Sequence, residues 1–531
     1  MNNYLLLTGV IIMICILLNK YLDRLPVPSL LIFIGIGMLF GENGIFGIAF
    51  DDYSAADTIC SISLVFIMFY GGFGINVKEA KPVAVKAVLL STFGVVMTAG
   101  LTGAFVHFVL KLPVLESMLI GSVIASTDAA SVFNILRSQK LALKYNTSSL
   151  LEMESGSNDP ISYMLTVIFV SMMSGSEVSV PMMLFKQIFA GALAGAVIGK
   201  LAVWKLQKNN FGNDQSQTIF VFAAAIIAYA LPTALGGNGY LSVYLCGMIM
   251  GNATLPMKRY LVHFFDVLTN VVQVLIFFLL GLLVTPVNLP AVFIPALLIM
   301  LFMTFIARPV SVVVLLAPFK SKMRQIGLVS WAGLRGVASI VFAILAVLNH
   351  VEMRYNLFNL VFCIVLLSIT FQGTLLPWMS YKMSMIDIHS NINKTFNDYQ
   401  EESDISFIKV HIKKRHPWAN KQIKNIPFGS ELLVAVILRG GERIVPNGNT
   451  QILPGDLLVI AAKSFEDREE MMLQEFVIDK NSRLKGKLIS ELPASENKLI
   501  ITIKRGEKTL IPRGNMRLEE NDILVEVNWE K

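Results

Sequence analysis

Thirteen stretches of this sequence are apolar and long enough to cross the roughly 30 Å hydrocarbon core of a lipid bilayer. Inside a bilayer the backbone must satisfy its own hydrogen bonds, so each stretch is predicted to be helical. The apolar sequence ends near Met385, and a polar, charged tail follows. The expected fold class is an all-α polytopic membrane protein with small α+β cytoplasmic domains. The predicted spans are 4–20, 27–48, 57–77, 83–109, 116–136, 149–174, 184–206, 217–232, 238–254, 264–285, 289–317, 326–349 and 356–379.

Lysine and arginine are distributed unevenly among the loops between these spans. Only Lys111, Lys186 and Arg354 follow even-numbered spans, and the connection at 41–56 is acidic. The positive-inside rule places the more basic loops in the cytoplasm, so we expect the N-terminus outside and the polar tail inside. An even number of spans would break this alternation. The basic residues that follow odd-numbered spans are Lys20, Arg24, Lys78, Lys81, Lys86, Lys140, Lys144, Lys205, Lys208, Lys258, Arg259, Lys320, Lys322 and Arg324.

Composition agrees with this class and excludes several others. A hydrophobic share of 54% and a mean hydropathy of +0.64 are too high for a soluble protein. The net charge of +7 resides mostly in loops, which indicates topology rather than nucleic-acid binding. No basic region precedes the first apolar segment, so a cleaved signal peptide is not expected. The four cysteines lie in apolar stretches without metal-ligand spacing and are expected to be buried free thiols: Cys15, Cys60, Cys246 and Cys363.

The fifth span contains a polar segment, ASTDAAS, at residues 125–131. Serine, threonine and aspartate side chains compete for backbone hydrogen bonds, so the helix is predicted to break here into two halves. Half-helix ends carry partial charges, and unwound carbonyls bind cations. We therefore interpret Asp128 as part of an ion site. The alternative is a tight helix-packing motif with a hydrogen-bonded aspartate.

The sixth span opens with ESGSNDP at residues 154–160. A carboxylate deep in a bilayer costs about 2.5–3.5 kcal/mol on insertion scales, so membrane proteins keep it mostly where an ion or proton must go. Low-dielectric surroundings favour the protonated form of a carboxylate, whereas a nearby cation favours the charged form. Asp159 is therefore predicted to alternate between a proton and an alkali cation, with Asn158 as a neutral hydrogen-bonding neighbour. Pro160 frees a backbone carbonyl near residue 156. The alternative is a structural aspartate that caps a broken helix.

Two further charges inside spans need partners. Glu154 lies about 140° around the helix from Asp159, so the two need not share a function. Arg335, in the segment WAGLRG at 331–336, requires an anion in the bilayer. We predict a structural Glu154–Arg335 pair, with Asp128 or Asp159 as the alternative partner of Arg335. Gly333 and Gly336 indicate a second broken helix. The charged residues expected at span ends, at the interface or facing loops, are His107, His263, Asp266 and Arg308.

Together these motifs resemble the bacterial NhaP-type branch of the monovalent cation:proton antiporters. The shared residues are Thr127-Asp128, the ESGSNDP segment and GLRG at 333–336. The resemblance covers residues 1 to about 385. It implies a thirteen-helix antiporter fold with an inverted repeat and crossed broken helices, assembled as a homodimer in the bacterial cell membrane.

The resemblance also implies residue roles. In this family the residue that matches Asp159 carries the ion and the proton, and the residues that match Thr127, Asp128, Asn158 and Ser155 line or support the site. The matched Glu154 and Arg335 form a stabilising pair. An Asn-Asp motif, as at 158–159, goes with electroneutral one-for-one exchange.

One position departs from the family pattern. Relatives often carry an acidic residue before a Gly-Gly pair in the third span, whereas this sequence reads Tyr70-Gly71-Gly72. The substitution removes a charge near the ion path, and it weakens the transfer of sodium-site details to this chain.

The polar tail contains an internal repeat with a period of 66 residues. The copies align Arg439-Gly440 with Arg505-Gly506, and DLLV at 456–459 with DILV at 522–525. Alternating apolar runs at 432–438 and 499–503 predict strands. The predicted domains are a transmembrane domain at 1–385, a linker at 386–403 and two repeat domains at 404–466 and 467–531.

The repeat resembles the TrkA-C subdomains of potassium-conductance regulators. No dinucleotide-binding fingerprint precedes it, so the NAD-binding half of such regulators is not expected. In that family these modules dimerise and sense small ligands, sometimes a cyclic dinucleotide. The alternative is a dimerisation cap without a ligand.

We therefore predict a secondary antiporter that exchanges cytoplasmic K⁺ or Na⁺ for H⁺, under control of the tail. The sequence shows no motif of a hydrolytic enzyme or ATPase, so transport would be driven by ion gradients. The regulator-like tail and Tyr70 favour K⁺ slightly. The alternatives are a ligand-gated cation channel, against which the lack of a TVGYG-like filter argues, and a non-transporting membrane sensor.

Overall fold

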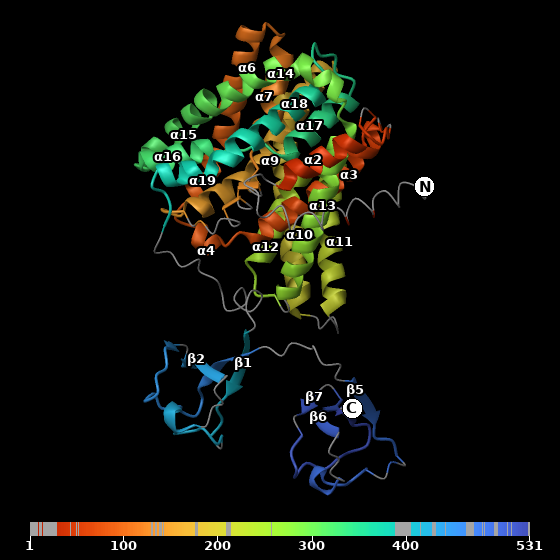
Figure 1. Cartoon of the computed structure of the whole chain (residues 1–531), viewed down its shortest axis with the longest axis vertical. Helices are drawn as coiled ribbons and strands as arrows, with labels where there is room; N and C mark the ends of the chain where they lie inside the picture. The colour runs from red at the N-terminus through yellow and green to blue at the C-terminus, as the bar shows by residue number, and fades with distance from the viewer. Residues whose placement is uncertain are drawn as a thin grey trace. The chain divides into compact units, whose positions relative to one another are not determined.

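The chain forms two compact units, Met1–Ile392 and Asn393–Lys531, in a computed structural model. The first is helical and the second is built from strands (Figure 1). Nearly all of the predicted span at 4–20, Cys15 and nearly all of the predicted linker at 386–403 lie outside the described residues. The described residues are 9, 13, 29–42, 44–48, 50, 52–128, 131–132, 135–136, 141, 143–175, 179–208, 214–255, 258–387, 405–414, 416–426, 432–440, 442–463, 472–480, 482, 484–492, 498–506, 508–510 and 512–528.

Among the described residues, every predicted span from 27–48 onward contains one helix or consecutive helical pieces. In three of these spans, a π-helical turn joins the two α-helical pieces of the same span. The turns are Leu90–Gly94, Met303–Ala307 and Ile369–Gly373. The helices are α2 (Ser29–Phe40), α3 (Tyr53–Gly74), α4 (Val77–Ala80), α5 (Ala84–Leu89), α6 (Val95–Leu110), α7 (Val114–Val123), α9 (Thr147–Met173), α10 (Val180–Lys208), α11 (Asp214–Ala234), α12 (Gly239–Gly251), α13 (Lys258–Leu283), α14 (Leu289–Phe302), α15 (Arg308–Leu316), α16 (Met323–Trp331), α17 (Val337–Leu348), α18 (Leu357–Ser368) and α19 (Thr374–Lys382).

The lengths of the helices fit a membrane protein. Among the described residues, seven helices are long and apolar enough to cross a bilayer. Shorter apolar helices include α7 and α17, which are halves of interrupted spans. Polar side chains set several helix starts, since Asp52, Asn238 and Asn356 each accept the backbone N–H three residues later.

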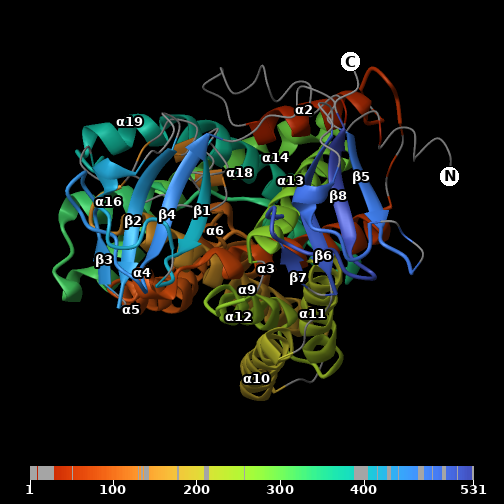
Figure 2. The same cartoon turned by 90° about the horizontal axis from the view of Figure 1, so that it is seen from below.

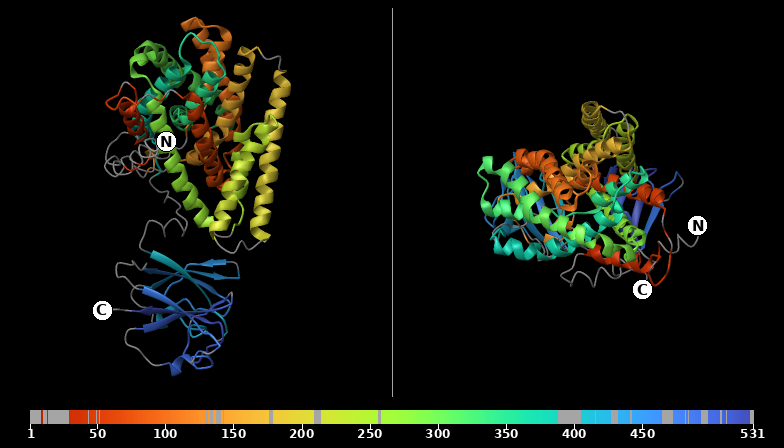
Figure 3. Two further views of the ribbon diagram at one scale, coloured as in Figure 1. Left: turned by 90° about the vertical axis from the view of Figure 1, so that its right-hand side faces the viewer. Right: turned by 90° about the horizontal axis from the view of Figure 1, so that it is seen from above.

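Glycines allow several pairs of helices to approach very closely. A Cβ atom at Gly72 of α3 would lie 2.3 Å from the Tyr244 carbonyl of α12, and one at Gly247 would lie 2.2 Å from the Phe69 carbonyl. Helices α2 and α13 meet in the same way at Gly37 and Gly281. Helices α10 and α11 also pack side by side, as the two long yellow helices of Figure 3 show.

Helix α9 runs through the middle of the helical unit (Figure 1) and contacts α7, α12 and α17. Opposite it, two spans are interrupted. Helix α7 ends at Val123, and residues 126–128 are not helical. Helix α16 ends at Trp331, and α17 begins only at Val337. Both predicted helix breaks are confirmed.

The second unit contains two four-stranded antiparallel sheets of identical topology (Figure 2). The first has the order β1-β4-β2-β3, and the second has the order β5-β8-β6-β7. Both copies carry a register shift at the same place, between Val434 and Val436 and between Ile500 and Thr502. The predicted repeat is confirmed. The strands are β1 (Ile405–His411), β2 (Leu432–Arg439), β3 (Glu442–Ile444), β4 (Leu457–Lys463), β5 (Met472–Val477), β6 (Lys498–Arg505), β7 (Lys508–Leu510) and β8 (Ile523–Asn528).

Candidate ion-binding site

The two interrupted spans are joined by hydrogen bonds to each other's backbone groups. The N–H of Asp128 donates to the Leu334 carbonyl at 2.8 Å. In return, the Arg335 guanidinium donates to the carbonyls of Ala125 and Ser126, at 2.7 and 2.8 Å. The crossing therefore satisfies unwound backbone groups that would otherwise be costly inside a membrane.

Helix α9 brings its polar face against this crossing. Asp159 is 5% exposed and accepts a very short hydrogen bond from the Ser126 hydroxyl. Asn158 is fully buried and donates its amide N–H to Thr127 Oγ1 at 2.5 Å. The Ser155 hydroxyl donates to the Thr127 carbonyl. The structure thus brings together Thr127, Ser155, Asn158 and Asp159.

Asp128 lies at the edge of this group and is half-buried. Its carboxylate accepts the backbone N–H of Ser131 at 3.2 Å and the Ser131 hydroxyl at 2.5 Å. These contacts agree with the alternative interpretation of Asp128 as a hydrogen-bonded aspartate in a tight packing motif. Its charge also acts on Asp159, so the two carboxylates repel each other when both are ionised.

The predicted Glu154–Arg335 pair is not a direct contact: among the described residues no ion pair joins the two, although the charge of Glu154 acts on Arg335. Glu154 instead forms an ion pair with Arg308 of α15, with 2.5 Å between Oε1 and the guanidinium nitrogen and without an aligned hydrogen bond. Arg335 binds the carbonyls at the end of α7, because the partial negative charge of a helix C-terminus supplies the anion that we expected from a side chain.

The prediction that Arg308 lies at a span end, at the interface or facing a loop, is wrong. It is 3% exposed and lies in the interior of the apolar segment 289–317, not at an interface. The same reasoning that singled out Arg335, a lone arginine inside a span, would have identified it. Ser126 is a second missed residue, and it lies in the same polar segment as Thr127 and Asp128.

The unusual Tyr70 has an acidic partner from another helix. Its hydroxyl donates to Asp266 of α13 at 3.1 Å. Asp266 is exposed and lies two turns inside its helix rather than at its end. A carboxylate is therefore present beside this position even though α3 does not supply it.

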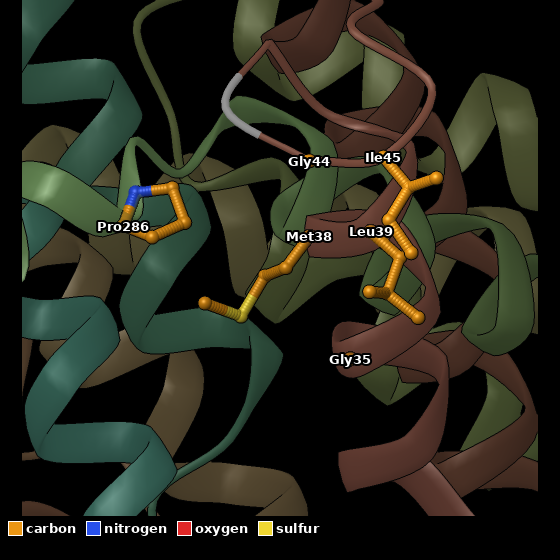
Figure 4. Close-up of a pocket in the computed structure, with 6 residues that line it drawn as sticks. All are labelled: Gly35, Met38, Leu39, Gly44, Ile45 and Pro286. Atoms are coloured by element: carbon orange, nitrogen blue, oxygen red, sulfur yellow. The ribbon is translucent and has the colours of Figure 1, made fainter.

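A pocket elsewhere in the helical unit is not a candidate ion site. It lies near the end of α2 and beside Pro286, and the residues that line it are apolar (Figure 4). A cation site needs oxygen ligands, which the crossing provides as carboxylates, hydroxyls, an amide and carbonyls. The lining residues are Gly35, Met38, Leu39, Gly44, Ile45 and Pro286.

Comparison with known proteins identifies the family of each unit. Residues 9–382 match the family described as "Sodium/hydrogen exchanger, transmembrane". Residues 408–464 and 473–525 match the TrkA-C domain.

Similar proteins of known name support the same family assignment. The chain is 31% identical over 484 residues to the K(+)/H(+) antiporter NhaP2 of Shewanella sp. strain ANA-3, covering 89% of this chain and 84% of that one. It is 33% identical over 470 residues to the K(+)/H(+) antiporter NhaP of Alkalimonas amylolytica, and the match covers 87% of this chain and 81% of that one.

The fold is also that of a solved antiporter. The structure of the sodium proton antiporter MjNhaP1 from Methanocaldococcus jannaschii at pH 8 superimposes with a TM-score of 0.63 at 22% identity, covering 71% of this chain and 97% of that one. The chain is a transporter, not an enzyme. It belongs to the sodium/hydrogen exchanger family, as a multi-pass membrane cation:proton antiporter of the NhaP type with two TrkA-C domains.

Proposed function

We propose that this protein exchanges K⁺ for H⁺ across the cell membrane, with Asp159 as the group that carries both ions in turn. The observation that carries the proposal is the position of Asp159, almost fully buried, bound by Ser126 at the crossing of two interrupted helices. A carboxylate in such surroundings needs either a proton or a cation, because an isolated charge is costly there.

The neighbours of Asp159 provide oxygen atoms without adding charge. Thr127, Ser155 and Asn158 are tied to one another by hydrogen bonds, which fixes their orientation. Asp128 adds a second carboxylate at the edge of the site. A dehydrated alkali cation needs several such ligands, and the proton needs only the Asp159 oxygen.

The charges around the site favour one-for-one exchange. Two arginines and three carboxylates lie at or beside the crossing. When all are ionised they carry one net negative charge, which one K⁺ or one H⁺ neutralises. The site is then most stable with a single monovalent ion bound, and the cycle is electroneutral. The residues of this set are Asp128, Glu154, Asp159, Arg308 and Arg335.

The relatives named above support K⁺ as the cation, since both are K(+)/H(+) antiporters. A more distant relative is a probable Na(+)/H(+) antiporter, at 26% identity over 316 residues. The resemblance to the antiporter family further supports a homodimer, with the N-terminus outside and the tail in the cytoplasm.

The tail is proposed to regulate exchange. Two segments of the tail match the TrkA-C domain, and the resemblance to potassium-conductance regulators implies modules that sense small ligands, in some cases cyclic dinucleotides. Their presence on the same chain as the antiporter supports a regulatory role more than a structural cap. Removing the residues after Asp387 should change the exchange rate or its response to cytoplasmic ligands.

Everted membrane vesicles test the transport proposal. A pH gradient is established, and K⁺, Na⁺ or Li⁺ is then added while the internal pH is followed with a fluorescent dye. We expect K⁺ to dissipate the gradient at the lowest concentration in the wild type. Asp159→Asn should show no exchange above background, because the amide binds neither ion.

Glu352→Gln is the matched control, since Glu352 is an exposed carboxylate in the loop before α18. It should exchange like the wild type. Exchange by Asp159→Asn at the wild-type rate would disprove the assignment of the carrier. Cation currents that persist without a pH gradient would instead support a channel, and a wild type that responds to no cation would support a sensor.

A further inference from the structure

The segment that leads into the tail is attached to the turn that precedes α9. Leu143 and Ile386 form an antiparallel β-bridge. The Lys144 N–H donates to the Met385 carbonyl at 2.8 Å, and its ammonium group donates to the Ser384 carbonyl at 3.2 Å. Backbone pairing and a charged side chain therefore join the end of the last span to the start of the helix that carries the candidate site.

The end of α19 determines where this segment runs. The Met385 N–H donates to the Ser380 carbonyl at 3.0 Å, and the Ser384 N–H donates to the Tyr381 carbonyl at 2.8 Å. These two bonds form a Schellman motif, which requires a left-handed residue after the helix. Here that residue is Ser384, with a φ of 54°, rather than a glycine. Met385 is fully buried, so the chain leaves α19 along a fixed path beside the turn before α9.

The same turn is held by α16 and the residue before it. Tyr145 and Asn146 have positive φ angles of 60° and 53°, a conformation that side chains disfavour. Gln325 donates to the Tyr145 carbonyl and to the Thr147 hydroxyl, each at 3.2 Å. Lys322 donates to the Tyr145 hydroxyl at 3.0 Å. A strained turn of this kind persists only where its surroundings hold it, and such turns are frequent in parts of proteins that switch.

The two helices that meet at this turn both lead to the candidate ion site. Helix α9 starts at Thr147, about three turns before Asp159. Helix α16 ends at Trp331, and Arg335 follows in the second interruption. A displacement at the bridge therefore acts on both elements that form the crossing.

The last span also contacts the crossing at its other end. The Ser368 hydroxyl accepts the Arg335 N–H at 3.1 Å and donates to the Gln372 side chain at 2.5 Å. The Trp331 indole donates to the Gln372 carbonyl at 3.2 Å. Gln372 lies in the π-helical turn that joins α18 to α19. Helix α19 is thus placed between a contact with the ion site and the bridge to α9, and it packs against α16 (Figure 1).

We propose that the Leu143–Ile386 bridge is the contact through which the tail controls exchange. The inference rests on the proposed regulation by the tail. The tail follows Ile386 in the chain, so a displacement of the tail is transmitted along the backbone to the bridge. The closed bridge restrains the start of α9. The open bridge lets α9 and Asp159 move as alternating access to the two faces requires.

A bridge that only stabilises the fold would remain closed throughout transport, and cysteines at both positions distinguish the two cases. The Lys144–Met385 bond flanks the pair, so Leu143 and Ile386 form a non-hydrogen-bonded pair. Cα atoms in such a pair are about 4.5 Å apart, which a disulfide tolerates.

Exchange is measured in everted vesicles with full-length Leu143→Cys/Ile386→Cys. Oxidation should lower the exchange rate by about fivefold or more, and a reductant should restore it. Both rates come from one variant, so any loss of packing caused by the substitutions cancels. The wild type, with its own cysteines, and each single variant should be insensitive to the oxidant. An unchanged rate after complete cross-linking would overturn the proposal.

Removing the residues after Asp387 from the same cysteine pair tests whether the tail acts through the bridge. In the reduced form, the truncation should change the exchange rate by about twofold or more. In the oxidised form, the truncated and full-length proteins should exchange at the same rate. An equal effect of truncation on both forms would overturn the proposal and leave regulation by the tail intact. No effect on either form would refute the regulation itself, and a wild type without exchange would refute the antiport.

Lys144→Ala covers the case in which the cysteine pair does not fold. It removes the ammonium contact with Ser384, so the bridge should open more readily and the exchange rate should rise by about twofold without a change in the KM for K⁺. Lys382→Ala is the matched control, because Lys382 is exposed and its ammonium group lies 4.5 Å from the centre of the Trp378 ring. It should exchange like the wild type. Equal rates in the two lysine variants would overturn the proposal.

Discussion

Glu154 of α9 and Arg308 of α15 form an ion pair of 2.5 Å in the interior of the helical unit, where the two side chains are 1% and 3% exposed. The pair joins the helix that carries Asp159 to a helix of another span. Arg335 lies close enough for its charge to interact with both residues. Glu154 therefore interacts with two arginines, in a direct ion pair with Arg308 and at longer range with Arg335.

Removing Arg308 should destabilise the protein strongly. Arg308→Ala removes the direct partner of the buried Glu154, and breaking a buried ion pair costs about 3–5 kcal/mol. Thermal melting in detergent should show a large loss, whereas Arg308→Lys should retain part of the stability. A double variant, Glu154→Gln/Arg308→Gln, should recover some of the loss because no charge remains unpaired. Equal stability of Arg308→Ala and the wild type would contradict the role of the pair.

Gly336 should not tolerate even one methyl group. A Cβ atom there would lie 2.4 Å from Asp128 Oδ2. Overpacking of this kind costs about 1–3 kcal/mol, so we expect Gly336→Ala to lower the affinity for K⁺ by about tenfold in vesicle exchange. Gly100→Ala in α6 meets nothing within 4 Å and should bind K⁺ like the wild type. The same KM in both variants would show that Asp128 has room to move.

The adjacent glycines of the third span should differ in their tolerance. A Cβ atom at Gly72 would lie 2.3 Å from the Tyr244 carbonyl, whereas one at Gly71 would meet nothing within 4 Å. Gly72→Ala should therefore separate α3 from α12 and lower the stability by about 1–3 kcal/mol. Gly71→Ala should melt like the wild type. If the two variants have the same melting temperature, the close approach of α3 and α12 is not required for stability.

The tail should lose stability in acid. Hydrogen bonds from Arg439, at 2.8 Å, hold the pKa of Asp456 below its ordinary value of 3.8. The pKa of Asp522 is lowered as well: burial alone would raise it, and the bonds from Arg505 and from the Glu519 N–H outweigh that effect. Since the folded state prefers the charged carboxylates, their contribution is complete above the unfolded pKa and disappears as the pH falls through the folded value.

This prediction can be measured on residues 393–531, which form a compact unit. Urea unfolding followed by tryptophan fluorescence should show a midpoint that falls steeply below about pH 4. Asp456→Asn should cost about 1.5–3 kcal/mol at neutral pH and make the first domain less dependent on pH. A midpoint that is constant from neutral to acidic pH would exclude the proposed effect of the two ion pairs.

Local sequence was sufficient for much of the architecture. Apolar stretches of bilayer length give helices at the predicted places, because hydrophobicity and chain length are properties of each segment alone. The interruptions at Asp128 and between Gly333 and Gly336 were also predictable, since they follow from residues that compete with helical hydrogen bonds. Asp159 was recognisable because a carboxylate in an apolar segment is costly wherever the segment packs.

The partners of the buried charges were decided only by the tertiary structure. From the sequence, Glu154 had one obvious candidate in Arg335, yet α15 brings Arg308 to it and the crossing gives Arg335 two backbone carbonyls. Likewise, the sequence indicated that Tyr70 removes an acidic charge from the third span, whereas in the structure α13 places the carboxylate of Asp266 beside it. A sequence records which charges must be neutralised, but which atoms neutralise them depends on how helices distant in the chain pack together.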